Sequence, residues 1–179
     1  AGAQKAIIAI KEHKPDLWEM LVEEAKNWDN IEPREVPDRY PMGWERVLVE
    51  TVFNKQYDKL PSELGVIVNN STTAISLSKA VREGKAITHR VVTVSGNGVK
   101  NPQNVEVAVG TPVDYIIEKI GGYIDDDCDG MVIAGGPMMG KSVMNDKFVI
   151  TPYSNALTVL KKEPVNTLPC LKCGECTLH

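Results

Sequence analysis

Through its first half, the chain alternates short apolar runs with segments in which apolar residues recur every three or four positions. Strand-like runs occupy residues 6–10, 31–36 and 66–68. Helices are predicted to begin at Pro15 and to span about 45–53 and 72–83, with Gly84 ending the last. Strands that alternate with helices favour a mostly parallel α/β arrangement for this region.

The pattern changes near residue 87 to that of an α+β unit. Strands are predicted at 90–95 and 105–109, separated by the turn triplet Gly96-Asn97-Gly98, whose Asn-Gly pair can adopt positive φ. A helix should begin after Gly110-Thr111-Pro112 and end at Gly121-Gly122. Further strand-like runs are 131–134, 148–150 and 156–160. This order predicts a helix lying across a small curled sheet.

Composition excludes several classes of protein. The 179 residues, 42% of them apolar, suffice for one core or two small packed ones. No apolar run approaches the roughly 18 residues of a membrane-spanning helix, and charges near the start interrupt any secretory signal, so a cytoplasmic location is expected. The net charge of −4, without a basic run, argues against nucleic acid as a partner.

Three of the four cysteines, Cys170, Cys173 and Cys176, form a C-x2-C-x2-C run. Such spacing is typical of iron–sulfur ligands, and the fourth cysteine of a ferredoxin-like run would fall just beyond His179. Half of a zinc site is the alternative, although zinc sites usually pair two distant C-x2-C knuckles. We therefore expect a piece of a longer protein, in agreement with a start that lacks methionine. Cys128 is expected to be unpaired.

Two other motifs have weaker claims. Residues 135–142 satisfy the phosphate-loop pattern G-x4-G-K-S and follow a strand, but too few residues follow for the helix that must hold the phosphates. Residues 125–130 match the first half of a calcium loop, yet Gly136 stands where a glutamate is needed. We interpret the first as a tight glycine crossing and the second as a solvated acidic turn.

Several segments together resemble a known family. The segments Arg90–Gly96, Asn101-Pro102, Val109–Pro112, Gly121-Gly122 and Ala134–Gly140 resemble a soluble-ligand-binding β-grasp (SLBB) domain. With Tyr40–Glu45 and Val68–Asn70 before it and the cysteines after it, nearly the whole chain resembles RnfC, a component of the Rnf electron-transport complex. Cobalamin reductase and an electron-transfer protein associated with proline reductase are built on the same plan.

This resemblance implies a back half of a flavoprotein domain like that of respiratory complex I, an SLBB module and iron–sulfur clusters. The positions that inherit contacts with FMN are Tyr40, Gly43, Glu45, Asn69 and Asn70, while Trp44 replaces a carboxylate of the related loop. The glycine-rich loop that holds the flavin phosphate in the family is absent from this sequence. We therefore expect FMN in the parent protein rather than in this segment alone.

The resemblance also implies a division and a function. The expected parts are an FMN-domain-like region (1–86), the SLBB module (87–145), a strand and linker segment (146–168) and a truncated cluster-ligand run (169–179). The parent would be an oxidoreductase that moves electrons between NADH and [4Fe–4S] clusters, other redox subunits or a terminal reductase. Both a soluble protein and one attached peripherally to a membrane complex agree with the resemblance. This segment alone should be inactive. The alternative is a docking module that holds a partner subunit or a corrinoid.

Overall fold

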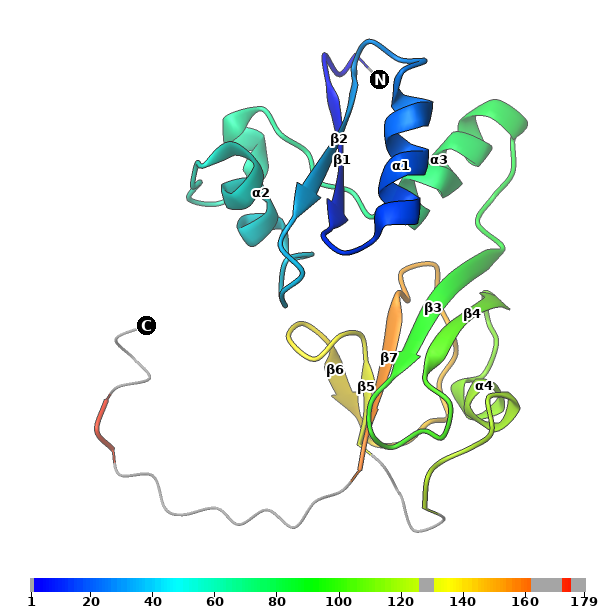
Figure 1. The fold of residues 1–179 in the computed structure, drawn as a ribbon. Coiled ribbons are helices and arrows are strands. Elements are labelled where there is room, and N and C mark those ends of the chain that lie inside the picture. The colour runs from blue at the N-terminus through cyan, green and yellow to red at the C-terminus, as the bar shows by residue number, and fades with distance from the viewer. Residues whose placement is uncertain (1, 126–130, 162–171, 175–179) are drawn as a thin grey trace. The chain divides into compact units, whose positions relative to one another are not determined.

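The chain divides into two compact units, Ala1–Asn70 and Ser71–His179. The structure is a computed structural model that describes residues 2–125, 131–161 and 172–174. Figure 1 shows helices and strands in both units. The expected mixed α/β class is confirmed.

The first unit is built on a β-α-β arrangement. Strands β1 (Ala6–Lys11) and β2 (Ile31–Val36) run parallel, in register from Ala6 opposite Ile31 to Lys11 opposite Val36. Between them, α1 (Pro15–Ala25) begins with the predicted proline and packs against β2. Helix α2 (Glu45–Phe53) and the short 3-10 helix η1 (Pro61–Leu64) follow. The predicted bounds of β2 and α2 are confirmed.

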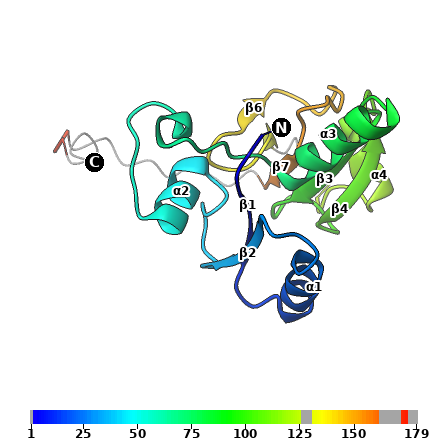
Figure 2. The ribbon, with the colours of Figure 1, turned by 90° about the horizontal axis from the view of Figure 1, so that it is seen from above.

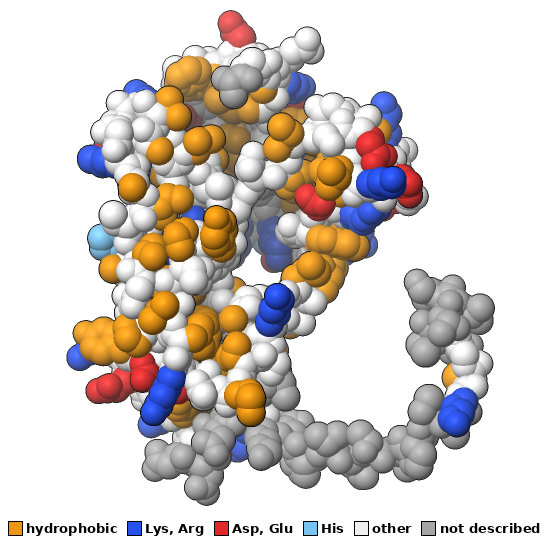
Figure 3. All heavy atoms as spheres, turned by 180° about the vertical axis from the view of Figure 1, so that it is seen from behind, with side chains coloured by type: hydrophobic (Ala, Val, Ile, Leu, Met, Phe, Trp, Pro, Cys, Tyr) orange, Lys and Arg blue, Asp and Glu red, His pale blue; other side chains and the backbone are white. Residues whose placement is uncertain are grey.

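The core of this unit is small, and much apolar surface remains exposed. Its buried hydrophobic residues are Ile10, Val36, Met42, Val49 and Tyr57. Hydrophobic side chains are visible among charged ones on the face drawn in Figure 3. The strand predicted at 66–68 is wrong: the segment is irregular and Ile67 is 81% exposed. A strand needs a partner to pair its backbone, and among the described residues β1 and β2 pair only with each other.

The second unit holds a mixed five-stranded sheet in the order β4-β3-β7-β5-β6. After α3 (Ser71–Glu83) come β3 (His89–Ser95), β4 (Gln103–Ala108), α4 (Val113–Lys119), β5 (Met131–Ala134), β6 (Lys141–Val143) and β7 (Ala156–Leu160). Strand β7 returns to the middle of the sheet, where it pairs parallel with β3 and antiparallel with β5.

Helix α4 covers one face of this sheet, as Figures 1 and 2 show. Its Val113, Ile116 and Ile117 are buried. The remaining buried hydrophobic residues of the cluster are Val92, Val94, Val99, Ile120, Val132, Ile150, Leu157 and Val159. A helix laid across a curled sheet is the arrangement expected from the sequence, and it carries the core of this unit.

Gly96 and Gly135 each allow another segment of this unit to approach the backbone closely. Gly96 has a φ of +108°, and a Cβ there would lie 2.0 Å from the Val159 carbonyl oxygen. Asn97 has no positive φ, so the left-handed residue of the predicted turn is Gly96 and not the Asn-Gly pair. In the β5–β6 hairpin, a Cβ on Gly135 would lie 2.8 Å from the Gly140 Cα, which explains the glycine-rich loop as a tight hairpin.

Two strand predictions in this unit need correction. Residues 148–150 form no strand, and only Val149 makes an isolated bridge, with Pro112. The short strand β6 was not predicted, because a three-residue Lys-Ser-Val segment has no pattern of its own and is defined by its pairing with β5. Among the described residues, no helix is long and apolar enough to cross a membrane.

Candidate functional site

Three of the predicted flavin positions share the segment that leads from β2 into α2. Tyr40 is 63% exposed, and its peptide bond to Pro41 is cis. A Cβ built on Gly43 would meet no atom within 4 Å, so open space adjoins the backbone there. Glu45, half-buried, is the first residue of α2. The segment follows the carboxyl end of a parallel strand, which is where α/β sheets usually place ligands.

Arg46 fixes the start of α2 to the loop that follows this helix. Its guanidinium donates to the backbone carbonyls of Tyr57 at 2.9 Å and of Asp58 at 2.6 Å. Arg34 on β2 holds the other end of α2 by donating to the Val52 carbonyl at 2.8 Å. Glu45 therefore sits on a helix that is tied at both ends, which is the kind of support a ligand-binding carboxylate needs.

Tyr57, which belongs to no motif in the sequence, lies against this site. Its side chain is buried, and among the described residues its hydroxyl has no hydrogen-bond partner. Burial raises the pKa of Tyr57, and the nearby Glu45 carboxylate raises that pKa further. Tyr57 also lines a pocket of about 260 Å³ together with Trp44, Arg46, Val47, Glu50 and Gln56. Nothing in the periodicity around residue 57 signals this placement.

Glu63 organises the same loop through its backbone. Its carboxylate accepts hydrogen bonds from the N–H groups of Asp58, Lys59 and Leu60, at 3.1, 2.8 and 3.0 Å. These backbone donors, with Leu60 the strongest influence, lower the pKa of Glu63. The loop that carries Tyr57 is therefore held by a charge-assisted cluster of hydrogen bonds.

The structure separates the two remaining flavin positions from the Tyr40 segment in sequence and in setting. Asn69 and Asn70 are exposed, at the end of the irregular segment that precedes α3. We expected them at the end of a strand, and that setting is absent because residues 66–68 form none. They lie immediately before α3, which begins at Ser71.

Of the cysteine run, only Cys173 lies within the described residues. It is exposed and not in a disulfide. Lys172 and Gly174 on either side both have positive φ, at 53° and 78°. Cys170, Cys176 and Cys128 lie outside the described residues. Within the described part of the chain, no group of three His, Cys, Asp or Glu side chains is placed to hold a metal ion.

The phosphate-loop motif does not form the site that it suggests. Lys141 and Ser142 lie in β6, so the strand-to-helix turn of a phosphate loop is absent. Of the acidic run, only Asp125 is described, and its carboxylate pairs with the Lys161 amine at 2.5 Å. Residues 126–130 lie outside the described part.

Comparison with known proteins covers almost the entire chain. Residues 1–79 match the Nuo51 FMN-binding domain, and residues 91–142 match the SLBB domain. The chain is 34% identical over 181 residues to the C subunit of the ion-translocating oxidoreductase complex of Rhodobacter capsulatus, a match that covers 98% of this chain and 34% of that protein. The chain is a homologue of the RnfC proteins. The expected resemblance to the RnfC family and the SLBB domain is confirmed.

Two further RnfC homologues match this chain with similar identity and over a similar share of its length. The C subunit of the Na(+)-translocating ferredoxin:NAD(+) oxidoreductase complex of Acetobacterium woodii is 30% identical, over 99% of this chain and 42% of that protein. The proton-translocating counterpart of Clostridium ljungdahlii is 32% identical, over 98% of this chain and 39% of that protein. The chain thus spans less than half the length of each of these curated relatives.

Proposed function

We propose that this chain is part of an electron-transfer protein that moves electrons between a nicotinamide cofactor and iron–sulfur clusters or partner redox proteins. The observation that carries the proposal is the match of residues 1–79 to an FMN-binding domain, inside a chain that is homologous to RnfC throughout. Two relatives are named as subunits of ferredoxin:NAD(+) oxidoreductase complexes, which supports a nicotinamide cofactor as one of the two reactants.

The residues of the β2–α2 segment fit one side of a flavin. Tyr40 offers an exposed aromatic face, Gly43 leaves room for a ring close to the backbone, and Glu45 offers a carboxylate on a tied helix. Exposed amides at Asn69 and Asn70 can donate to and accept from flavin or phosphate oxygens. Bound FMN supplies two-electron and one-electron redox chemistry. The protein residues would bind and orient it and would exchange no protons themselves.

Cys170, Cys173 and Cys176 are proposed as three ligands of a [4Fe–4S] cluster. The spacing supports this assignment, as do the exposure of Cys173 and the positive φ of the residues on either side of it. Thiolates hold the irons, and nearby backbone N–H donors adjust the reduction potential. The fourth ligand would come from outside these residues.

The partners proposed are other redox subunits of a multi-subunit complex or a terminal reductase, reached from the cytoplasmic side and with peripheral attachment to a membrane complex. The names of the relatives, which are subunits of ion-translocating complexes, support this assignment.

The test uses the chain extended at both ends to the length of its relatives, reconstituted anaerobically with FMN, iron and sulfide. We expect retained flavin, a broad absorption near 400 nm and a reducible EPR signal. Cys173→Ala should abolish the EPR signal of this cluster and leave the flavin in place, whereas Glu45→Gln should weaken flavin retention and leave the cluster. Exposed Glu35→Gln is the matched control. A protein that takes up neither flavin nor iron would contradict the proposal and favour a docking module for a partner subunit or a corrinoid.

A further inference from the structure

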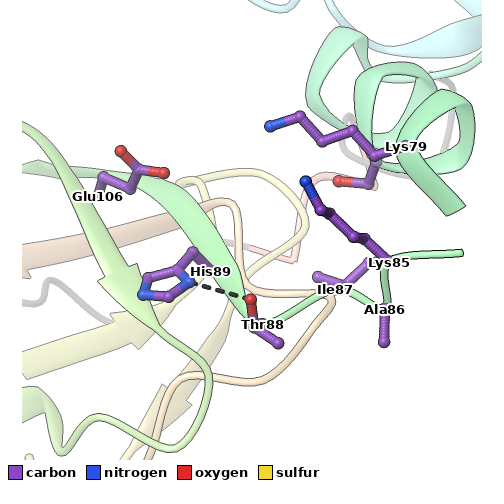
Figure 4. Close-up of a pocket in the computed structure, with 8 residues that line it drawn as sticks. Lys79, Lys85, Ala86, Ile87, Thr88, His89 and Glu106 are labelled. Carbon is purple, nitrogen blue, oxygen red and sulfur yellow. Dashed lines mark hydrogen bonds between the residues drawn. The ribbon is translucent and has the colours of Figure 1, made fainter. Parts of the chain in front are cut away.

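A pocket of about 280 Å³ in the second unit lies outside every residue assigned above. It is lined by Ser76, Lys79, Lys85, Ala86, Ile87, Thr88, His89 and Glu106. These residues come from α3, from the segment that follows it, and from β3 and β4. In Figure 4 the Lys79 and Lys85 amines both point toward the side of the pocket where His89 and Glu106 stand.

Donors outnumber acceptors in this pocket. In the described structure, the Lys79 amine makes no ion pair or hydrogen bond. The Lys85 amine pairs with Glu83 at 2.6 Å, on a side chain that is 70% exposed. The backbone N–H groups of Ala86 and Ile87 donate to no acceptor among the described residues. Two lysine amines and two backbone donors without an acceptor, all on residues that line one pocket, favour an anionic ligand.

His89 adds a donor, and Glu106 sets a limit. The His89 Nδ1 atom is 3.0 Å from the Thr88 hydroxyl. When the hydroxyl donates to Nδ1, the neutral ring carries its proton on Nε2 and presents it away from Thr88. Glu106 lies on β4, diagonally across from His89 in the antiparallel register, and its carboxylate repels an anion. Ile87, 37% exposed, gives the pocket an apolar wall.

We propose that this pocket binds a phosphoryl group, either free phosphate or the phosphate of a small organic monoester. The two lysines and the amides of Ala86 and Ile87 would surround the phosphoryl oxygens. The organic part of a monoester would lie against Ile87, and Glu106 would accept from its hydroxyl or amino groups. The pocket shares no residue with the FMN and cluster positions, and the inference does not rest on the proposed electron-transfer function.

The test titrates the isotopically labelled chain with inorganic phosphate, adenosine 5′-monophosphate or adenosine, and follows the amide signals of Ala86 and Ile87 by NMR. Both phosphates should shift these signals saturably, whereas adenosine should not. Tighter binding of the monophosphate would identify an organic phosphate as the ligand, and equal binding would identify the phosphoryl group alone. Saturable shifts with adenosine, or none with either phosphate, would overturn the proposal.

Variants separate a built site from general attraction of anions. Lys79→Ala and Lys85→Ala should each weaken phosphate binding about tenfold, as expected for charge-assisted hydrogen bonds. Lys147→Ala removes an exposed lysine outside the pocket and should leave the affinity unchanged. Glu106→Gln should strengthen binding, because it removes a like charge without removing an acceptor. Equal effects of all three lysine variants, or weaker binding by Glu106→Gln, would contradict the site.

Discussion

The guanidinium of Arg46 lies over the Tyr57 ring, 4.7 Å from its centre, while it donates to the Tyr57 backbone carbonyl at 2.9 Å. One side chain thus joins the first turn of α2 to a loop eleven residues further along the chain. This contact holds the buried Tyr57 against the first turn of α2, which begins at Glu45, where the flavin site is proposed.

Arg46→Ala is expected to lower the free energy of unfolding of the first unit by about 2 kcal/mol, because it removes two hydrogen bonds and a cation–π contact. Urea denaturation followed by Tyr and Trp fluorescence measures this change. Arg39→Ala, which removes an exposed arginine, is the control and should be nearly neutral. Equal midpoints for the two variants would show that the Arg46 contact contributes nothing.

The Glu63 carboxylate predicts a dependence of stability on pH. Its pKa is held below the ordinary value of 4.5 by three backbone N–H donors. A group with a lowered folded-state pKa contributes stability that is complete above its unfolded pKa and is lost as the pH falls through its folded pKa. An NMR titration of the Glu63 carboxyl carbon should therefore show a midpoint below 4.5.

Glu63→Gln tests the same cluster at neutral pH. The amide nitrogen of glutamine would meet a backbone N–H where a carboxylate oxygen now accepts, so the variant should melt at a lower temperature than the parent. It should also lose the part of the acid sensitivity that Glu63 causes. Glu35→Gln, on an exposed position of β2, should change neither. An unchanged acid profile in Glu63→Gln would show that other groups control it.

Two glycines with positive φ allow strain and steric overlap to be separated. Gly110 has a φ of +93° and open space around a Cβ, so Gly110→Ala should cost only backbone strain, about 1–2 kcal/mol. Gly96→Ala adds an overlap with the Val159 carbonyl on β7 and should cost about 4 kcal/mol. Calorimetric melting of both variants measures the difference. Similar melting temperatures would mean that β7 can move away at little cost.

The helices and most strands could be predicted because their signals are local. Pro15 begins α1, and Gly121-Gly122 follow α4 with φ values of +109° and +85°. The errors occurred where strand formation depends on a pairing partner. Residues 66–68 are apolar enough for a strand but have no neighbouring strand to pair with among the described residues. Lys141–Val143 forms a strand because β5 lies beside it. The apolar pattern of a segment does not show which strand, if any, will pair with it in a sheet.

Among the candidate sites too, those with a local sequence motif could be predicted and those formed by packing could not. The Tyr40–Glu45 segment could be predicted from its motif and its place after a strand. Tyr57 and the Lys79–Lys85 pocket could not, because their residues come together only through the packing of separate segments. Neither Tyr57 nor this pocket belongs to a motif whose residue spacing would indicate a binding site.

Arg90 is buried in the second unit at 3% exposure, and its guanidinium donates to the Asn155 side-chain oxygen. Among the described residues its Nε atom has no hydrogen-bond partner. Because a buried charge that loses its partner is costly, Asn155→Ala should lower the free energy of unfolding by about 1–3 kcal/mol. Arg90→Met removes the buried charge together with its need for a partner and should cost less. In the Arg90→Met background, Asn155→Ala should then be nearly neutral, and this coupling is measured by a double-mutant cycle in urea. An equal cost of Asn155→Ala in both backgrounds would show that Asn155 stabilises the unit through its own loop and not through Arg90.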